Sequence, residues 1–104
     1  MDIRLNTDKN IEGKEALAAQ VAAAVERALQ RFDKQITRIE VHLSDEDAGK
    51  SGRDDKRCLM EARLEGRQPV AVTHHAGSLS EAVDGAANKL KSLLTTALGR
   101  LSGH

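Results

Sequence analysis

The side chains best suited to chemistry in this chain are two adjacent histidines, His74 and His75, and one cysteine, Cys58. Adjacent residues on a strand point to opposite faces, so the two histidines make a poor shared set of metal ligands. A zinc site needs three or four well-placed ligands, and no cysteine lies near the histidines in the sequence. A cysteine beside a histidine can act as a nucleophile, but the alternation around Cys58 places this thiol in the core. We therefore predict a structural thiol, no metal site and no catalytic residue.

The two histidines have a simpler interpretation. One lies at a strand end beneath a helix, and the other faces solvent. As a further hypothesis, His42 and His75 are neighbours on the solvent-facing side of the sheet.

Loops that would hold a cofactor are absent from the sequence. Neither GxGxxG nor GxxxxGK[ST] occurs, so no phosphate-binding loop is indicated. The acidic residues of the segment 45–56 lack the spacing of EF-hand ligands. We interpret this segment as a long, mobile, solvated hairpin loop and expect no cofactor.

Charged residues give the remaining signal for function. The chain has sixteen basic and sixteen acidic residues, so its net charge does not indicate nucleic-acid binding. Phe32 is the only aromatic residue, which weakens any model in which bases stack on aromatic side chains. Basic residues that gather on one surface remain possible RNA contacts. Arg27, Arg31 and Lys34 cluster at the end of the first predicted helix, where such residues are typical of a solvated surface and complement the helix dipole.

Six segments with regular patterns must position these residues. Apolar residues alternate in four segments and recur every three or four residues in two others. Strands are expected at 2–6, 36–44, 57–65 and from Pro69 onward, and helices at 14–32 and 79–98. Ser78 and Glu81 have the spacing of a capping box at the start of the second helix.

Two apolar rows are expected to face the core. In the second strand the row is Thr37, Ile39, Val41 and Leu43. On the second helix it is Ala82, Val83, Ala86, Leu90, Leu93 and Leu94.

The order β-α-β-β-β-α predicts an α+β fold. Strands two to four form an antiparallel meander, and the first helix allows a right-handed parallel crossover. A four-stranded mixed sheet with both helices packed on one face is the simplest way to bury the apolar rows. We expect one domain over residues 1–101 and a frayed tail at 102–104. Neither a signal peptide nor a membrane-spanning stretch is seen, which suggests a cytoplasmic protein.

The order and spacing of these elements resemble a known family. The most specific stretch is Val70-Ala-Val72, a short loop, Ala82-Val83-Asp84, and then Lys89-Leu90. This pattern, with the N-terminal strand and helix, is similar to that of the ribosome hibernation promoting factor and ribosome-associated inhibitor family, also called ribosomal subunit interface proteins. The resemblance implies a fold like that of double-stranded RNA-binding domains. It also implies a protein without enzymatic activity that binds the small ribosomal subunit in the messenger and transfer RNA channel. There it blocks translation in stationary phase or stress.

The resemblance points to particular basic residues as RNA contacts. Compared position by position, the resemblance implies that Lys89 and Lys91 are RNA contacts, with Arg100 as a looser candidate. Further candidates come from the strand pattern and not from the family: Arg38, Arg57 and Arg63. Family members usually have more basic residues after the Lys-Leu pair, whereas Ser92, Leu93, Thr95 and Thr96 stand here. Fewer phosphate contacts predict weaker binding with a flatter salt dependence.

Two functions from different classes follow. The first is a ribosome binder that silences translation sterically, with ribosomal RNA of the small subunit as its partner. The alternative is a protein–protein interaction module on the same fold, with self-association through the open sheet face or the Ala-rich helix. A continuous basic strip would favour RNA, and a neutral or apolar patch would favour protein.

Overall fold

The computed structural model describes residues 1–46 and 55–101, with side chains up to residue 98. The elements are β1 (Asp2–Thr7), α1 (Lys14–Leu29), a short 3-10 helix η1 (Gln30–Phe32), β2 (Ile36–Asp45), β3 (Lys56–Leu64), β4 (Val70–Ala76) and α2 (Leu79–Leu101). The segment 47–54, which includes most of the predicted hairpin loop, and the predicted tail 102–104 lie outside the described residues.

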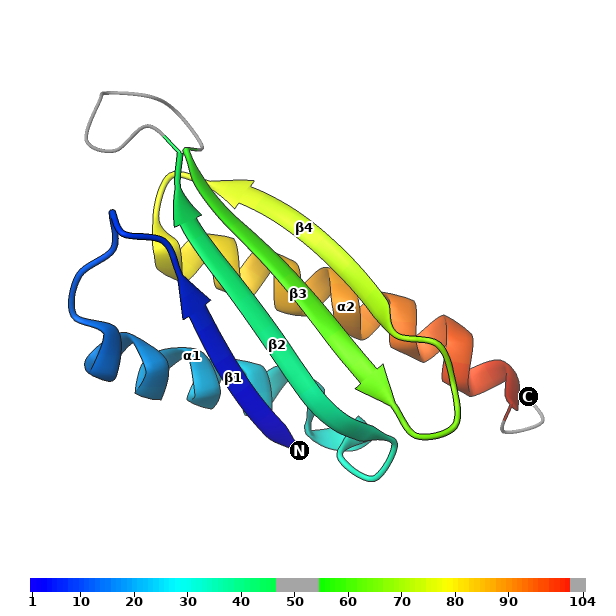
Figure 1. The fold of residues 1–104 in the computed structure, drawn as a ribbon. Helices are drawn as coiled ribbons and strands as arrows, with labels where there is room; N and C mark the ends of the chain where they lie inside the picture. Colours follow the sequence, from blue (N-terminus) through cyan, green and yellow to red (C-terminus); the bar gives the residue numbers. More distant parts are fainter. Residues whose placement is uncertain (47–54, 102–104) are drawn as a thin grey trace.

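The four strands form one mixed sheet in the order β1-β2-β3-β4. β1 pairs with β2 in parallel, and the other two pairs are antiparallel. Figure 1 shows both helices behind the sheet, so they cover one face and leave the other open. The predicted β-α-β-β-β-α order, the mixed sheet and the placement of the helices are confirmed. That residues 1–101 act as one domain stays a prediction.

Alternation along the central strands builds the core. Ile39 of β2 pairs with Ala62 of β3, and Val41 pairs with Met60, and all four side chains are fully buried. Burying a side chain such as Val or Ile contributes about 1.5–3 kcal/mol. This row therefore fixes which face of the sheet receives the helices.

The start of β2 departs from the predicted row. The pairing with β3 shifts between Ile36 and Arg38, as in a β-bulge. Ile36 is consequently buried, while Thr37 is exposed and its hydroxyl donates to the carbonyl of Arg63 at 3.0 Å. The prediction that Thr37 faces the core was wrong, because one extra residue reverses the side-chain alternation locally.

Helix α1 follows a glycine in the left-handed region. Gly13 has a φ of 68°, a conformation that a residue with a β-carbon adopts only with strain. Val21, Val25 and Leu29 then form the buried stripe of the helix. Phe32 of η1 is 5% exposed and extends this stripe, so the predicted helical segment ends as a tighter turn.

Helix α2 begins with the predicted serine and glutamate. The Glu81 N–H donates to Ser78 Oγ at 3.2 Å, as in a capping box. In a capping box the glutamate side chain would accept from the backbone N–H of Ser78. Here Glu81 Oε1 instead accepts from the Ser78 hydroxyl at 2.9 Å. Leu93 was predicted to be buried but is 40% exposed, whereas Ala87 is buried in its place. The buried stripe of α2 is otherwise as predicted: Ala82, Val83, Ala86, Leu90 and Leu94.

Among residues 1–46 and 55–101, none of the helices combines the length and the apolar character that crossing a membrane requires.

Candidate functional site

The two adjacent histidines lie on opposite faces of β4. His74 faces α2 so closely that a β-carbon at Gly85 would overlap its imidazole ring. His75 is exposed on the other face, with Nε2 3.0 Å from Glu46 Oε1. This arrangement confirms the simpler interpretation of the pair. The hypothesis that His42 neighbours His75 was wrong, because His42 pairs with Leu59 on β3 while His75 lies beyond β3, opposite Arg57.

Cys58 is a fully buried thiol. It pairs across the strands with His74, so a cysteine and a histidine do meet in this fold. Burial raises the pKa of Cys58 to about 12, with Arg57 opposing this shift slightly. The thiol is therefore protonated near neutral pH and is a poor nucleophile. Within the described residues, no group of three or more His, Cys, Asp or Glu side chains is placed to hold a metal ion.

The open face of the sheet carries three of the predicted RNA contacts. Arg38 and Arg63 are cross-strand partners, and each has a glutamate two residues away on its own strand. Arg63 Nε is 3.2 Å from Glu61 Oε1, and Arg38 Nη1 is 3.8 Å from Glu40 Oε2. These carboxylates partly neutralise the pair, so the open face alternates in charge.

Arg57, on the same face, makes no ion pair with any residue in the described part of the chain. It borders a shallow hollow with residues of β1 and β2, including Asn6, His42 and Ser44, and with Asp8.

The candidate RNA contacts on helix α2 differ in their surroundings. Lys89 Nζ donates to the backbone oxygen of Thr73 at 2.9 Å, so this ammonium is bound to the edge strand β4. Lys91 is exposed on the same helix. The backbone of Arg100 belongs to α2, but its side chain lies outside the described residues. Direct contact of any of these residues with RNA stays a prediction.

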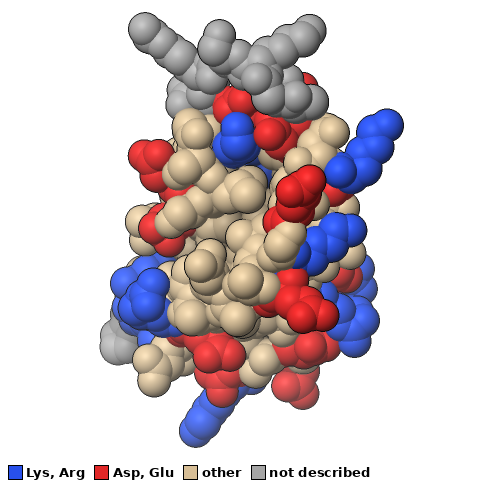
Figure 2. Space-filling view, turned by 90° about the vertical axis from the view of Figure 1, so that its left-hand side faces the viewer, with Lys and Arg blue, Asp and Glu red and all other residues tan. Residues whose placement is uncertain are grey.

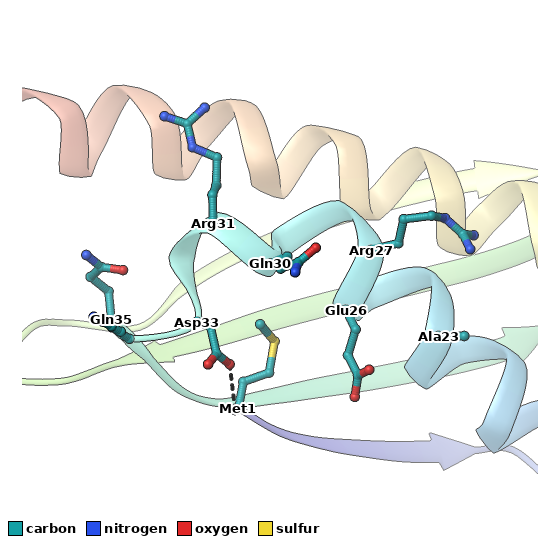
Figure 3. A pocket seen from close by; sticks show the side chains of 9 residues that line it. Met1, Ala23, Glu26, Arg27, Gln30, Arg31, Asp33 and Gln35 are labelled. Atoms are coloured by element: carbon teal, nitrogen blue, oxygen red, sulfur yellow. Dashed lines mark hydrogen bonds and ion pairs between the residues drawn. The ribbon is translucent and has the colours of Figure 1, made fainter.

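A hollow at the end of α1 gathers basic residues that the sequence analysis treated as solvated surface. It has a volume of about 880 Å³ and lies between α1, η1 and the start of β1 (Figure 3). We call it the α1-end hollow. Its lining is Met1, Ala23, Glu26, Arg27, Gln30, Arg31, Asp33, Lys34 and Gln35. Arg27 and Arg31 are four residues apart, a helical spacing that could have indicated their shared surface from the sequence, whereas Lys34 lies beyond both helical segments.

Charges in the α1-end hollow are unevenly distributed. The Met1 amino group is 2.9 Å from Asp33 Oδ1, and this carboxylate raises the pKa of the amino group. In Figure 3, Glu26 and Asp33 extend toward Met1, whereas Arg27 and Arg31 extend from the helical ribbon away from it. Glu26 and Asp33 therefore lie on a different side of the hollow from Arg27 and Arg31.

Figure 2 shows the side of the molecule that lies at the left in Figure 1. Its centre is uncharged, and Lys, Arg, Asp and Glu side chains of both signs surround it. No continuous basic strip runs over this face, in agreement with the balanced net charge.

The fold agrees with the family to which the sequence comparison assigns this chain. The chain belongs to the sigma 54 modulation protein / S30EA ribosomal protein family, whose model matches residues 6–102. The family assignment of the sequence analysis is thereby confirmed, and the protein is a member of a ribosome-associated family.

Solved structures agree with this assignment. The N-terminal domain of Thermus thermophilus Protein Y has a TM-score of 0.66 and 25% identity, covering 92% of this chain and 98% of that one. A ribosomal subunit interface protein from Coxiella burnetii has a TM-score of 0.71 and covers 95% of this chain and 99% of that one. At 17% identity, this second structure supports the fold alone. A comparison with curated proteins found no match.

Proposed function

We propose that this protein binds the small ribosomal subunit and blocks translation by occupying the channel of messenger and transfer RNA. The observation that carries the proposal is the family match over residues 6–102, together with a complete β-α-β-β-β-α fold. The protein acts in the cytoplasm, during stress or stationary phase, when idle ribosomes are preserved.

The mechanism is steric and electrostatic, without enzymatic activity. Ribosomal RNA presents phosphates, and Lys and Arg side chains bind phosphates with release of counterions. The chain offers cations of this kind in Arg57 and Lys91, which are not neutralised by carboxylates in the described structure. The buried, protonated thiol of Cys58 supports the absence of covalent chemistry.

The mixed charge of the surface limits the affinity. Arg38 and Arg63 must exchange their glutamate partners for phosphates, and Lys89 must leave the Thr73 carbonyl. We therefore expect weaker and less salt-dependent binding than that of a strongly basic relative.

Pelleting with separated ribosomal subunits and titration of a cell-free translation reaction test the proposal. Saturable binding to small subunits, with inhibition over the same concentration range, is the expected result. Binding only to large subunits would contradict the choice of partner. Binding to neither subunit at low salt, with translation unaffected, would reject a ribosomal role and favour the protein–protein interaction module.

A further inference from the structure

The outer edge of β1 presents backbone groups to which no described part of the chain binds. Figure 1 shows β1 at one side of the sheet and β4 at the other, and within the described residues β1 pairs only with β2. An unpaired edge of this kind is a template for a further strand. We propose that β1 pairs antiparallel with β1 of a second copy of this chain, which joins two sheets into one. This inference does not depend on ribosome binding.

The backbone groups of β1 alternate between the two sides of the strand. The Asp8 N–H, just past β1, donates to the Leu43 carbonyl of β2 at 3.2 Å. Because alternate residues of a strand direct their N–H and C=O groups to the same side, the even-numbered residues of β1 face β2. Ile3, Leu5 and Thr7 therefore direct these groups outward. None of the outward groups forms a hydrogen bond within residues 1–46 and 55–101.

The apolar side chains of β1 are only partly buried. Ile3 and Leu5 point to the face that carries the helices and pack against the core, but both remain half-buried. Their partners on β2, Ile39 and Val41, are fully buried because a strand lies on each side of them. A second β1 would cover the outer side of Ile3 and Leu5 in the same way. Burial of apolar surface thus adds to the hydrogen bonds of the new strand pair.

The charges of β1 select one register for this pairing. Two antiparallel copies related by a two-fold axis place one residue opposite itself at the centre. With Ile3 at the centre, Asp2 of each copy lies opposite Arg4 of the other on the open face. With Arg4 at the centre two arginines meet, and with Leu5 at the centre Asp2 meets Asp8. Opposite charges stabilise a cross-strand pair and like charges destabilise it, so β1 is complementary to itself when centred on Ile3.

The surroundings of β1 leave room for a second copy. Ala24 of α1 faces a small groove beside α2. Ala18 and Ala22 lie on the opposite flank of the buried stripe of α1, toward the free edge of β1, where small side chains permit a close approach. The edge of β4 differs, because the Thr73 carbonyl there already accepts from Lys89 Nζ at 2.9 Å. These contrasts favour β1 as the edge that pairs.

The experiment reverses the charge of two exposed side chains. Asp2 and Arg4 are 54% and 58% exposed, so their replacement should leave the core intact. The β1 variants are Asp2→Arg and Arg4→Asp. The control variants are Glu65→Arg and Arg67→Asp, which make the same charge changes in the exposed turn between β3 and β4. Sedimentation equilibrium measures self-association of each protein up to about 1 mM chain.

We expect the wild type to form a weak dimer, with a Kd between about 10 µM and 1 mM for so small an interface. Each β1 variant sets like charges opposite each other in two places, which should raise the Kd by about tenfold or more. A mixture of the two β1 variants brings opposite charges face to face and should form a heterodimer. The control variants should associate like the wild type.

Three results of sedimentation would overturn the proposal. The first is a wild type that stays monomeric at about 1 mM. The second is self-association of the β1 variants that equals that of the wild type. The third is a mixture that associates no more strongly than either β1 variant alone.

Amide hydrogen exchange of the wild type tests the edge without any variant. The outward N–H groups of Ile3 and Leu5 should exchange more slowly as the protein concentration rises, whereas the Arg4 N–H, which faces β2, should not change. Equal behaviour of the three amides would also reject pairing at this edge. Because no ribosome is present in either experiment, a negative result leaves the proposed function intact.

Discussion

Replacement of Gly85 by alanine tests how closely α2 packs on β4. A β-carbon at this position would overlap three atoms of the His74 ring, including Cγ, which is attached directly to the β-carbon of His74. Rotation of the ring plane leaves Cγ in place, so the histidine must change χ1 or the helix must move. Overpacking of this kind costs about 1–3 kcal/mol. Alanine in a helix interior regains about 0.8–1.0 kcal/mol relative to glycine.

The steric cost should exceed the gain in helix propensity. We expect Gly85→Ala to lower the free energy of unfolding by about 1 kcal/mol, which corresponds to roughly 4–8 °C in Tm. In a His74→Ala background the overlap is gone, and the same substitution should stabilise the protein by up to about 1 kcal/mol. The coupling between the two positions is then about 2 kcal/mol.

Urea-induced unfolding of the wild type, both single variants and the double variant measures this coupling. Opposite signs for Gly85→Ala in the two backgrounds would support the packing described here. Stabilisation by Gly85→Ala in the wild type, or an equal effect in both backgrounds, would refute the reasoning.

Three other predictions concern single side chains. Lys89→Gln should lower the free energy of unfolding by about 0.5–1.5 kcal/mol because it removes the bond to Thr73, whereas Lys91→Gln should leave thermal stability unchanged; equal losses in calorimetry would contradict the distinction. Burial raises the pKa of Cys58 to about 12, so iodoacetamide at pH 8 should label this thiol only when urea unfolds the chain, and rapid labelling of the folded protein would contradict its burial. The Lys56 ammonium, 2.9 Å from Asp55 Oδ1, holds the pKa of that carboxyl below its usual range. This pair stabilises the fold above the unfolded-state pKa of about 4, and its contribution is lost as pH falls through the lower folded-state pKa. The urea midpoint of Asp55→Asn should therefore depend less on pH below about 4 than that of the wild type; parallel curves would contradict the ion pair.

The sequence predicted the fold well because its periodicities are local. Alternation in β3 and the three-to-four spacing in the helices depend only on residues near one another along the chain. The errors occurred where tertiary packing intervenes. Thr37 turned outward because of the register shift after Ile36, and Leu93 remained exposed while Ala87 packed against the core.

The candidate site was harder to predict because its charges depend on distant partners. The glutamates beside Arg38 and Arg63 were visible in the sequence, but their ion pairs required the strand geometry. The bond from Lys89 to Thr73 spans sixteen residues, and the ion pair between Met1 and Asp33 spans thirty-two. Spacing alone grouped Arg27, Arg31 and Lys34 but did not show that the neighbouring carboxylates are directed elsewhere.

The salt dependence of binding to small ribosomal subunits tests the central claim most directly. Equilibrium binding is measured from about 50 to 200 mM monovalent salt, a range over which phosphate contacts strongly weaken. The proposed function predicts saturable binding, with log K falling linearly against log salt at a slope of about −2 or steeper. Absence of saturable binding at the lowest salt, or affinity that does not change over this range, would contradict a ribosome binder that acts through phosphate contacts.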